Sequence, residues 1–293
     1  MAIINAIAIG KAKGSLGNMT LRYVKGATIG SQKVLKKGKG GTFKQVRIRA
    51  KWGNLVNLFQ AFSGTLKLAF ESKNPRVSDF NAFIARNVNR STVYLTSGEV
   101  LQGGAVVFGA QITEGSLPAI SHMMGTGDVL VTDLYVGSMS ITASTTLKAF
   151  SNAIVNNNDG WAYGDQLSVY IVTQSVNSET NVPYVTVNAV EVTLTDTDED
   201  TVLRDIVGAD AISIVDGHVG MGATVNGAAC YVHSRETANG LQVSTQSLVP
   251  ANAILPTYQS AIQMMKAIES YHGDSDAAFL TPNIPDTPVA PVP

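Results

Sequence analysis

The chain has 293 residues, 45% of them hydrophobic and 15% charged, so it can bury a substantial core and is not disordered overall. Its single cysteine, Cys230, excludes an intrachain disulfide, and no apolar run approaches the ~20 residues of a membrane-spanning helix. The net charge of −1 hides an asymmetry, because residues 1–70 carry 13 basic and no acidic side chains, whereas residues 71–293 carry 8 basic and 22 acidic ones. Such an asymmetry indicates charged partners and says little about fold.

Residues 1–41 are predicted to form a basic, glycine-rich arm. Residues 20–24 and 27–34 have the pattern of two short strands joined by a turn at Lys25-Gly26. The following stretch, 35–41, reads LKKGKGG and is predicted to be a basic loop. We expect such an arm to become ordered on a partner.

Residues 42–90 are predicted to form a helical pair. Apolar residues recur at helical spacing after Thr42, a plausible N-cap, and this run ends at Asn74-Pro75. The cations at its start oppose the helix dipole unless an anion or an acidic neighbour compensates them. A second helix is expected over 79–87 after Ser78, with Phe80, Phe83 and Ile84 buried.

Residues 91–272 are predicted to be mainly β. Alternating patterns separated by turns favour an antiparallel β-sandwich over a parallel sheet. Helices are expected over 144–155 and, late in the chain, over 256–271. Strands are expected over 93–96, 105–112, 128–136, 138–143, 167–174, 184–194, 211–215, 222–234 and 241–248. Residues 273–293 form a proline-rich tail, predicted to be an extended linker or strap. The predicted fold class is therefore α+β, mainly β.

Motifs of known chemistry are mostly missing from the sequence. The basic loop lacks the G-x-x-x-x-G-K-[ST] spacing of a phosphate-binding loop. Asp196, Asp198 and Asp200 have the spacing of a calcium loop, but Thr201 and Val207 replace its glycine and glutamate, so an acidic turn is favoured. The four histidines are scattered and are interpreted as surface or hydrogen-bonded residues. We therefore predict no enzyme, no cofactor and no metal site.

Two further features have both a structural and a functional interpretation. Cys230 is interpreted as a buried apolar residue, with His233 on the opposite face of its strand. Trp161 and Tyr163 follow the turn 156–160 and could form a sugar-stacking platform, although ordinary packing is favoured.

The basic arm and the start of the first helix are the predicted subunit interface. In one interpretation these cations lie on the acidic surface of a second copy, in a head-to-tail contact that builds rings or filaments. In another they contact nucleic acid through its phosphates. In a third the arm folds back on its own acidic part. The residues concerned are Lys11, Lys13, Arg22, Lys25, Lys33, Lys36, Lys37, Lys39, Lys44, Arg47 and Arg49.

The order of several short motifs resembles an uncharacterised family, a domain of unknown function found in Bacteroidota and in phages that infect them. The resemblance spans most of residues 1–272, but residues 35–41 and the proline tail depart from the family's usual pattern. It implies a β-rich assembly component and brings no catalytic residues with it. The motifs are Gly10, Gly14, Gly17 and Asn18; Gln45-x-x-x-Arg49 with Trp52 and Phe59; Phe70; Ser78-x-x-Asn81; Gly115-Ser116-Leu117-Pro118; Gly164-Asp165-Gln166-Leu167 with Val169-Tyr170; and Ser234 with Ser244.

Taken together, the sequence predicts a structural subunit that assembles with copies of itself. The resemblance makes a phage virion protein, assembled in the host cytoplasm with other virion proteins and without a membrane, the leading form. The alternatives are a glycan-binding or cell-surface-binding module and a nucleic-acid-contacting scaffold.

Overall fold

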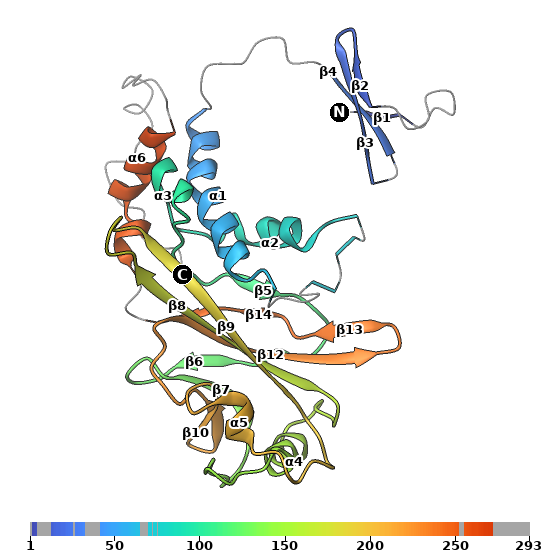
Figure 1. The fold of residues 1–293 in the computed structure, drawn as a ribbon, viewed down its shortest axis with the longest axis vertical. Helices are drawn as coiled ribbons and strands as arrows, with labels where there is room; N and C mark the ends of the chain where they lie inside the picture. The colour runs from blue at the N-terminus through green and yellow to red at the C-terminus, as the bar shows by residue number, and fades with distance from the viewer. Residues whose placement is uncertain are drawn as a thin grey trace. The chain divides into compact units, whose positions relative to one another are not determined.

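The structure of the chain is a computed structural model that describes residues 2–4, 13–25, 27–32, 42–64, 70–71, 73–74, 76–251 and 255–271. It separates into two compact units, residues 1–41 and residues 42–293. The chain is α+β, and its sheets are small and antiparallel (Figure 1). Within the described helices, no segment has the length and apolarity of a membrane span.

The first unit is a four-stranded antiparallel sheet with strand order β1-β4-β3-β2. Val24 pairs with Ala27 across the predicted turn at Lys25, so the expected hairpin is confirmed. Gly17 has a φ of +54° and begins the other tight turn, which joins β2 to β3. The strands are β1 (Ala2–Ile4), β2 (Gly14–Leu16), β3 (Met19–Val24) and β4 (Ala27–Gln32).

Helices α1, α2, α3, α4 and α6 of the second unit begin after a serine or threonine that caps them, whereas α5 begins after Val202 without a side-chain cap. Thr42 and Gln45 form a capping box at the start of α1, and the hydroxyl of Ser78 accepts the N–H of Asn81 at the start of α2. The predicted helix over 79–87 is confirmed with both ends. The helices are α1 (Phe43–Ala61), α2 (Asp79–Asn87), α3 (Ser97–Leu101), α4 (Leu147–Asn157), α5 (Leu203–Val207), the 3-10 turn η1 (Pro256–Gln259) and α6 (Ala261–Ser270).

The described residues of the second unit form three antiparallel sheets. The central one has strand order β13-β12-β8-β9, with β15 also paired to β12; a second has order β10-β11-β7-β6, and a third consists of β14 and β5. The strands are β5 (Gln111–Thr113), β6 (His122–Met124), β7 (Leu130–Tyr135), β8 (Gln166–Val176), β9 (Pro183–Thr193), β10 (Ser213–Val215), β11 (His218–Gly220), β12 (Gly227–Thr237), β13 (Gly240–Val243), β14 (Gln246–Ser247) and β15 (Val249–Pro250).

The central sheet is buried on both faces, because alternate residues of its strands belong to different hydrophobic clusters. Tyr170 and Val172 of β8 pack in a cluster with α1 and α2, whereas Leu167 and Val169 pack in a second cluster with α4, α5 and β7. Figure 1 shows these two groups of elements on opposite sides of the long strands. Two-sided burial explains why β8 and β12 are nearly continuous in apolar residues.

Several predicted strands are wrong in whole or in part, among them 222–234, whose paired part begins only at Gly227 in β12. Residues 93–96 form no strand, because the N–H groups of Tyr94 and Leu95 donate to the carbonyls of Tyr258 and Ala50. In 105–112 only the end pairs as β5. The amide of Asn54 in α1 bonds both the N–H and the C=O of Val106, so a side chain replaces a strand neighbour. Residues 138–143 form a turn in which the Thr145 hydroxyl accepts the N–H of Thr142.

Candidate functional site

The first unit carries exposed apolar and basic side chains on a sheet of a single layer. Tyr23 and Met19 lie on one face of β3, Arg22 and Val24 lie on the other, and all four are exposed. The clusters of buried apolar residues found among the described residues all lie in the second unit. Small sheets usually gain stability by packing an apolar face against another element.

The predicted interface residues are described in part. Lys13, Arg22 and Lys25 are exposed on the first unit, and Lys44, Arg47 and Arg49 are exposed on α1. Lys11, Lys33, Lys36, Lys37 and Lys39 lie outside the described residues, as do the loop at 35–41, His272 and the proline tail. Whether the six described cations act in one interface stays a prediction.

The start of α1 is a basic helix face with two large exposed apolar side chains. Ile48 and Trp52, one turn apart, are 49% and 41% exposed; Lys44 lies one turn before Ile48, and Arg49 directly follows it. The first turn contains no acidic residue, and no α1 cation takes part in the ion pairs formed among the described residues. Positive charge at this end of a helix is unfavourable on its own and favours an anionic neighbour.

Tyr94 is the neighbour that these cations contact inside the chain. The Arg47 guanidinium donates to the Tyr94 hydroxyl at 3.3 Å, and the Lys51 ammonium lies 5.5 Å from the centre of the Tyr94 ring. Burial and the charge of Arg47 lower the pKa of Lys51 below its ordinary value. The contacts hold the cations in place but do not neutralise them.

Acidic residues gather at 196–210, around the start of α5. Asp198 accepts the N–H groups of Asp200 and Thr201, so the predicted acidic turn is confirmed, and Glu199 forms an ion pair with Lys148. No group of side chains able to hold a metal is found in the described part of the chain. Asp205 and Asp210 are exposed, and α5 lies toward the end of the second unit opposite α1 (Figure 1).

The predicted platform residues are held by neighbours of their own. The Trp161 indole stacks on the His233 imidazole, with ring centres 3.8 Å apart and planes 12° apart, so that face of the indole is covered. The Tyr163 hydroxyl donates to Asn152 at 2.8 Å. Trp161 also borders a hollow of about 260 Å³ that Asn157, Asn158, Asp159 and Asp133 help to line.

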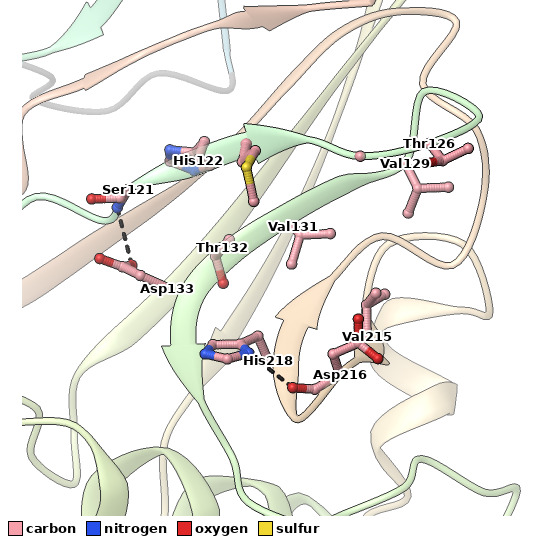
Figure 2. A pocket seen from close by; sticks show the side chains of 12 residues that line it. Ser121, His122, Thr126, Val129, Val131, Thr132, Asp133, Val215, Asp216 and His218 are labelled. Carbon is pink, nitrogen blue, oxygen red and sulfur yellow. Dashed lines mark hydrogen bonds between the residues drawn. The ribbon is translucent and has the colours of Figure 1, made fainter.

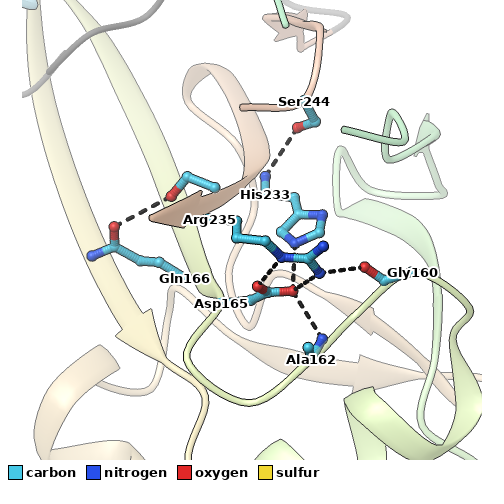
Figure 3. Close-up of polar contacts among 8 residues, drawn as sticks. Gly160, Ala162, Asp165, Gln166, His233, Arg235 and Ser244 are labelled. Atoms are coloured by element: carbon cyan, nitrogen blue, oxygen red, sulfur yellow. Dashed lines mark hydrogen bonds and ion pairs between the residues drawn. The ribbon is translucent and has the colours of Figure 1, made fainter. Parts of the chain in front are cut away.

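A buried ionic cluster lies beneath this platform (Figure 3). Both Nε and Nη2 of Arg235 donate to the carboxylate of Asp165 at 2.6 Å, and Nη2 also donates to the Gly160 carbonyl at 2.7 Å. The carboxylate accepts the Ala162 N–H at 2.9 Å and lies 2.8 Å from Nε2 of His233. The cluster thereby fastens the loop before β8 to strand β12.

The protonation states in this cluster follow from burial and from its hydrogen bonds. Burial opposes the Asp165 charge, but the hydrogen bonds from Arg235, Ala162 and His233 outweigh it, so the pKa of the carboxyl lies below its ordinary value. Burial lowers the pKa of His233, which is neutral and donates from Nε2 to Asp165. The His233 side chain is 1% exposed, and its Nδ1 has no partner within the described structure. This histidine is therefore closed off from any substrate in solution.

Cys230 is fully buried, and burial raises the pKa of its thiol. It belongs to the first cluster, whereas its neighbour Tyr231 belongs to the second, so His233 lies on the opposite face of β12, as predicted. A protonated thiol that no base reaches is not a nucleophile. This pair carries no catalytic chemistry.

A cavity of about 850 Å³ lies on the sheet formed by β6, β7, β11 and β10 (Figure 2). Its walls are mainly apolar, with Met123, Val131 and Val215 beside His218. His122 also lines the cavity. Its Nε2 accepts the Tyr231 N–H, 2.8 Å away, and burial lowers its pKa to about 4. The sequence had no signal for this groove, because its residues come from two separate hairpins.

Comparisons of this chain with protein-family models, with curated proteins and with solved structures find no match.

Proposed function

We propose that this chain is a structural subunit that assembles with copies of itself through its basic N-terminal arm. The observation that carries the proposal is the first unit, a single-layered sheet with exposed Met19, Tyr23 and Val24 and no hydrophobic cluster of its own among its described residues. The phage virion setting comes from the family resemblance. We also propose that the second unit is an antiparallel sandwich. The hydrophobic cluster to which both β7 and β8 contribute supports this part of the proposal.

The charge distribution supports a second copy as the partner. The first 70 residues carry 13 cations and no acid, and the remaining residues have 14 more acids than bases. The basic face of α1, with Ile48 and Trp52, supplies apolar contact area beside the charges. Helix α5, which carries the exposed Asp205 and precedes the exposed Asp210, lies toward the end of the second unit opposite α1 (Figure 1). A contact between different surfaces of two copies builds rings or filaments.

Light scattering of the full chain and of a deletion of residues 2–41, at equal protein concentrations, tests the arm. We expect the full chain to form assemblies that lose mass as salt is added, and the deletion to form none. Equal assembly of both forms contradicts the role of the arm.

A charge swap tests the partner surface. Lys44→Glu/Arg49→Glu is expected to weaken assembly, as is Asp205→Lys/Asp210→Lys, whereas a mixture of the two variants restores it. Arg90→Glu, a reversal at an exposed residue outside these surfaces, is the matched control. If the mixture assembles no better than either variant alone, the acidic surface is not the partner.

A glycan-binding module is the second candidate, and the hollow beside Trp161 favours it. Asn157 and Asp159 supply exposed polar groups next to an aromatic edge. A glycan array with Asn157→Ala/Asp159→Ala tests it without disturbing the Trp161–His233 stack.

A nucleic-acid scaffold, the third candidate, predicts DNA affinity that falls steeply with salt and depends on Lys44 and Arg49.

A further inference from the structure

Strand β9 is an edge of the central sheet, and the pairing pattern shows which of its backbone groups face outward. The N–H of Leu194 donates to Asp165 on the β8 side, and the carbonyl of Val182 accepts from Asn177 on that side. Because inward and outward groups alternate along an antiparallel strand, the odd-numbered residues of β9 face away from β8. The carbonyl of Pro183 agrees, since it accepts the N–H of Ala105 from outside the sheet.

The outward backbone groups of Val185, Val187 and Ala189 form no hydrogen bond with any other described residue. Such a row is a template for another strand, and proteins that avoid this place Lys, Pro or bulges along the edge. Residues 184–190 contain none of these, and the eleven pairs between β8 and β9 run without a register shift. The even-numbered side chains Thr186 and Asn188 are exposed.

We propose that β9 pairs with β9 of a second copy, antiparallel and about a two-fold axis at Val187, so that the two central sheets become one. This inference rests on the proposed self-assembly and gives it a second, symmetric contact. The backbone of Val187 then hydrogen-bonds to the backbone of Val187 in the second copy. The backbone of Val185 likewise hydrogen-bonds to that of Ala189 in the second copy.

The sequence of β9 is self-compatible in this register. Thr186 lies opposite Asn188, and Glu191 lies opposite Pro183, so no like charges meet. Pro183 has no N–H and therefore ends the ladder. The side chains of Val185, Val187 and Ala189 pack against the first hydrophobic cluster, so pairing extends this apolar layer across the axis. A two-fold contact combined with a head-to-tail one extends the assembly beyond a dimer.

The full chain with exposed residues of β9 replaced tests this contact. In Thr186→Lys/Asn188→Lys, lysines face each other across the axis, and we expect sedimentation velocity to show at least a tenfold weaker association. In Thr186→Lys/Asn188→Glu, each lysine faces a glutamate, and we expect association to return to at least the parent level. Circular dichroism and thermal unfolding check that both variants fold. Amide exchange at Val185, Val187 and Ala189 should slow as parent concentration rises.

The results separate this contact from the arm. If only the deletion of residues 2–41 lowers the mass and both β9 variants behave like the parent, the β9 contact is overturned and the arm proposal stands. If the β9 lysine variant dissociates and the deletion does not, the β9 contact is supported and the arm fails. A parent chain that is monomeric at all concentrations overturns both.

Discussion

The indole of Trp161 and the imidazole of His233 are stacked, with ring centres 3.8 Å apart and planes 12° apart. The imidazole is buried and neutral, and it donates to Asp165. Trp161 therefore covers the ionic cluster that fastens its loop to β12, a packing role of the kind that the sequence favoured over a ligand platform.

Trp161→Ala should lower the free energy of unfolding by about 2 kcal/mol, because it removes a half-buried ring and exposes the histidine to water. Trp161→Phe should lower the free energy of unfolding by less, since an aromatic ring still stacks on the His233 imidazole. Urea unfolding measures both, with Trp52→Ala as the control: Trp52 is 41% exposed, and its removal should cost under 1 kcal/mol. Equal losses for the two tryptophans contradict a structural role for the stack.

Asp165→Asn should cost about 2 to 3 kcal/mol of folding free energy. The amide presents donors to Arg235, and the guanidinium loses its anionic partner at a carboxylate that is 2% exposed. Partial exposure of Arg235 to water limits the loss. Asp159→Asn changes an exposed carboxylate of the preceding turn and is expected to stay within about 0.5 kcal/mol of the parent.

Acid should destabilise the fold through His122 before carboxylates titrate. Burial lowers the folded-state pKa of His122 to about 4, and an unfolded histidine has a pKa of about 6.5. The unfolded state therefore binds the proton first, and stability is complete above pH ~6.5 and falls toward pH ~4 by up to about 3 kcal/mol. His233, whose pKa is also lowered, acts in the same direction.

His122→Gln isolates this contribution, since the glutamine carbonyl can still accept the Tyr231 N–H. Its stability should depend less steeply on pH between 6.5 and 4 in urea titrations at several pH values. An unchanged slope would mean that His122 is already accessible to protons in the folded chain.

Local signals in the sequence predicted where α1 and α2 begin, but they did not predict α3, α5 or the clusters of side chains. Thr42 and Ser78 mark helix starts because a cap acts within three residues. The hairpin at Lys25 was equally local. By contrast, Asp165, His233 and Arg235 meet only because β8 pairs with β12, where Leu167 lies opposite His233. Alternation along β12 puts His233 and Arg235 on one face, and this was the only sign in the sequence that these side chains belong to one cluster.

The prediction of a strand over 105–112 failed at residues 105–110 for a related reason. Its apolar residues are buried and extended, as a strand's are, yet the hydrogen bonds of Val106 come from Asn54 and that of Val107 from Gln174. Side chains distant in sequence replace a neighbouring strand, and the hydrophobic pattern of the segment does not predict these hydrogen bonds.

Asn54→Ala should therefore be among the costliest single substitutions in α1. The side chain is fully buried, and its amide donates to the Val106 carbonyl at 3.0 Å and accepts the Val106 N–H at 2.7 Å. Removal leaves a buried donor and a buried acceptor unsatisfied, at about 1 to 3 kcal/mol each, so we expect a loss of about 3 kcal/mol in urea unfolding. Gln60→Ala, at an exposed position of the same helix, is the control and should be nearly neutral. A small loss for Asn54→Ala would show that water replaces both hydrogen bonds and that 105–110 does not depend on α1.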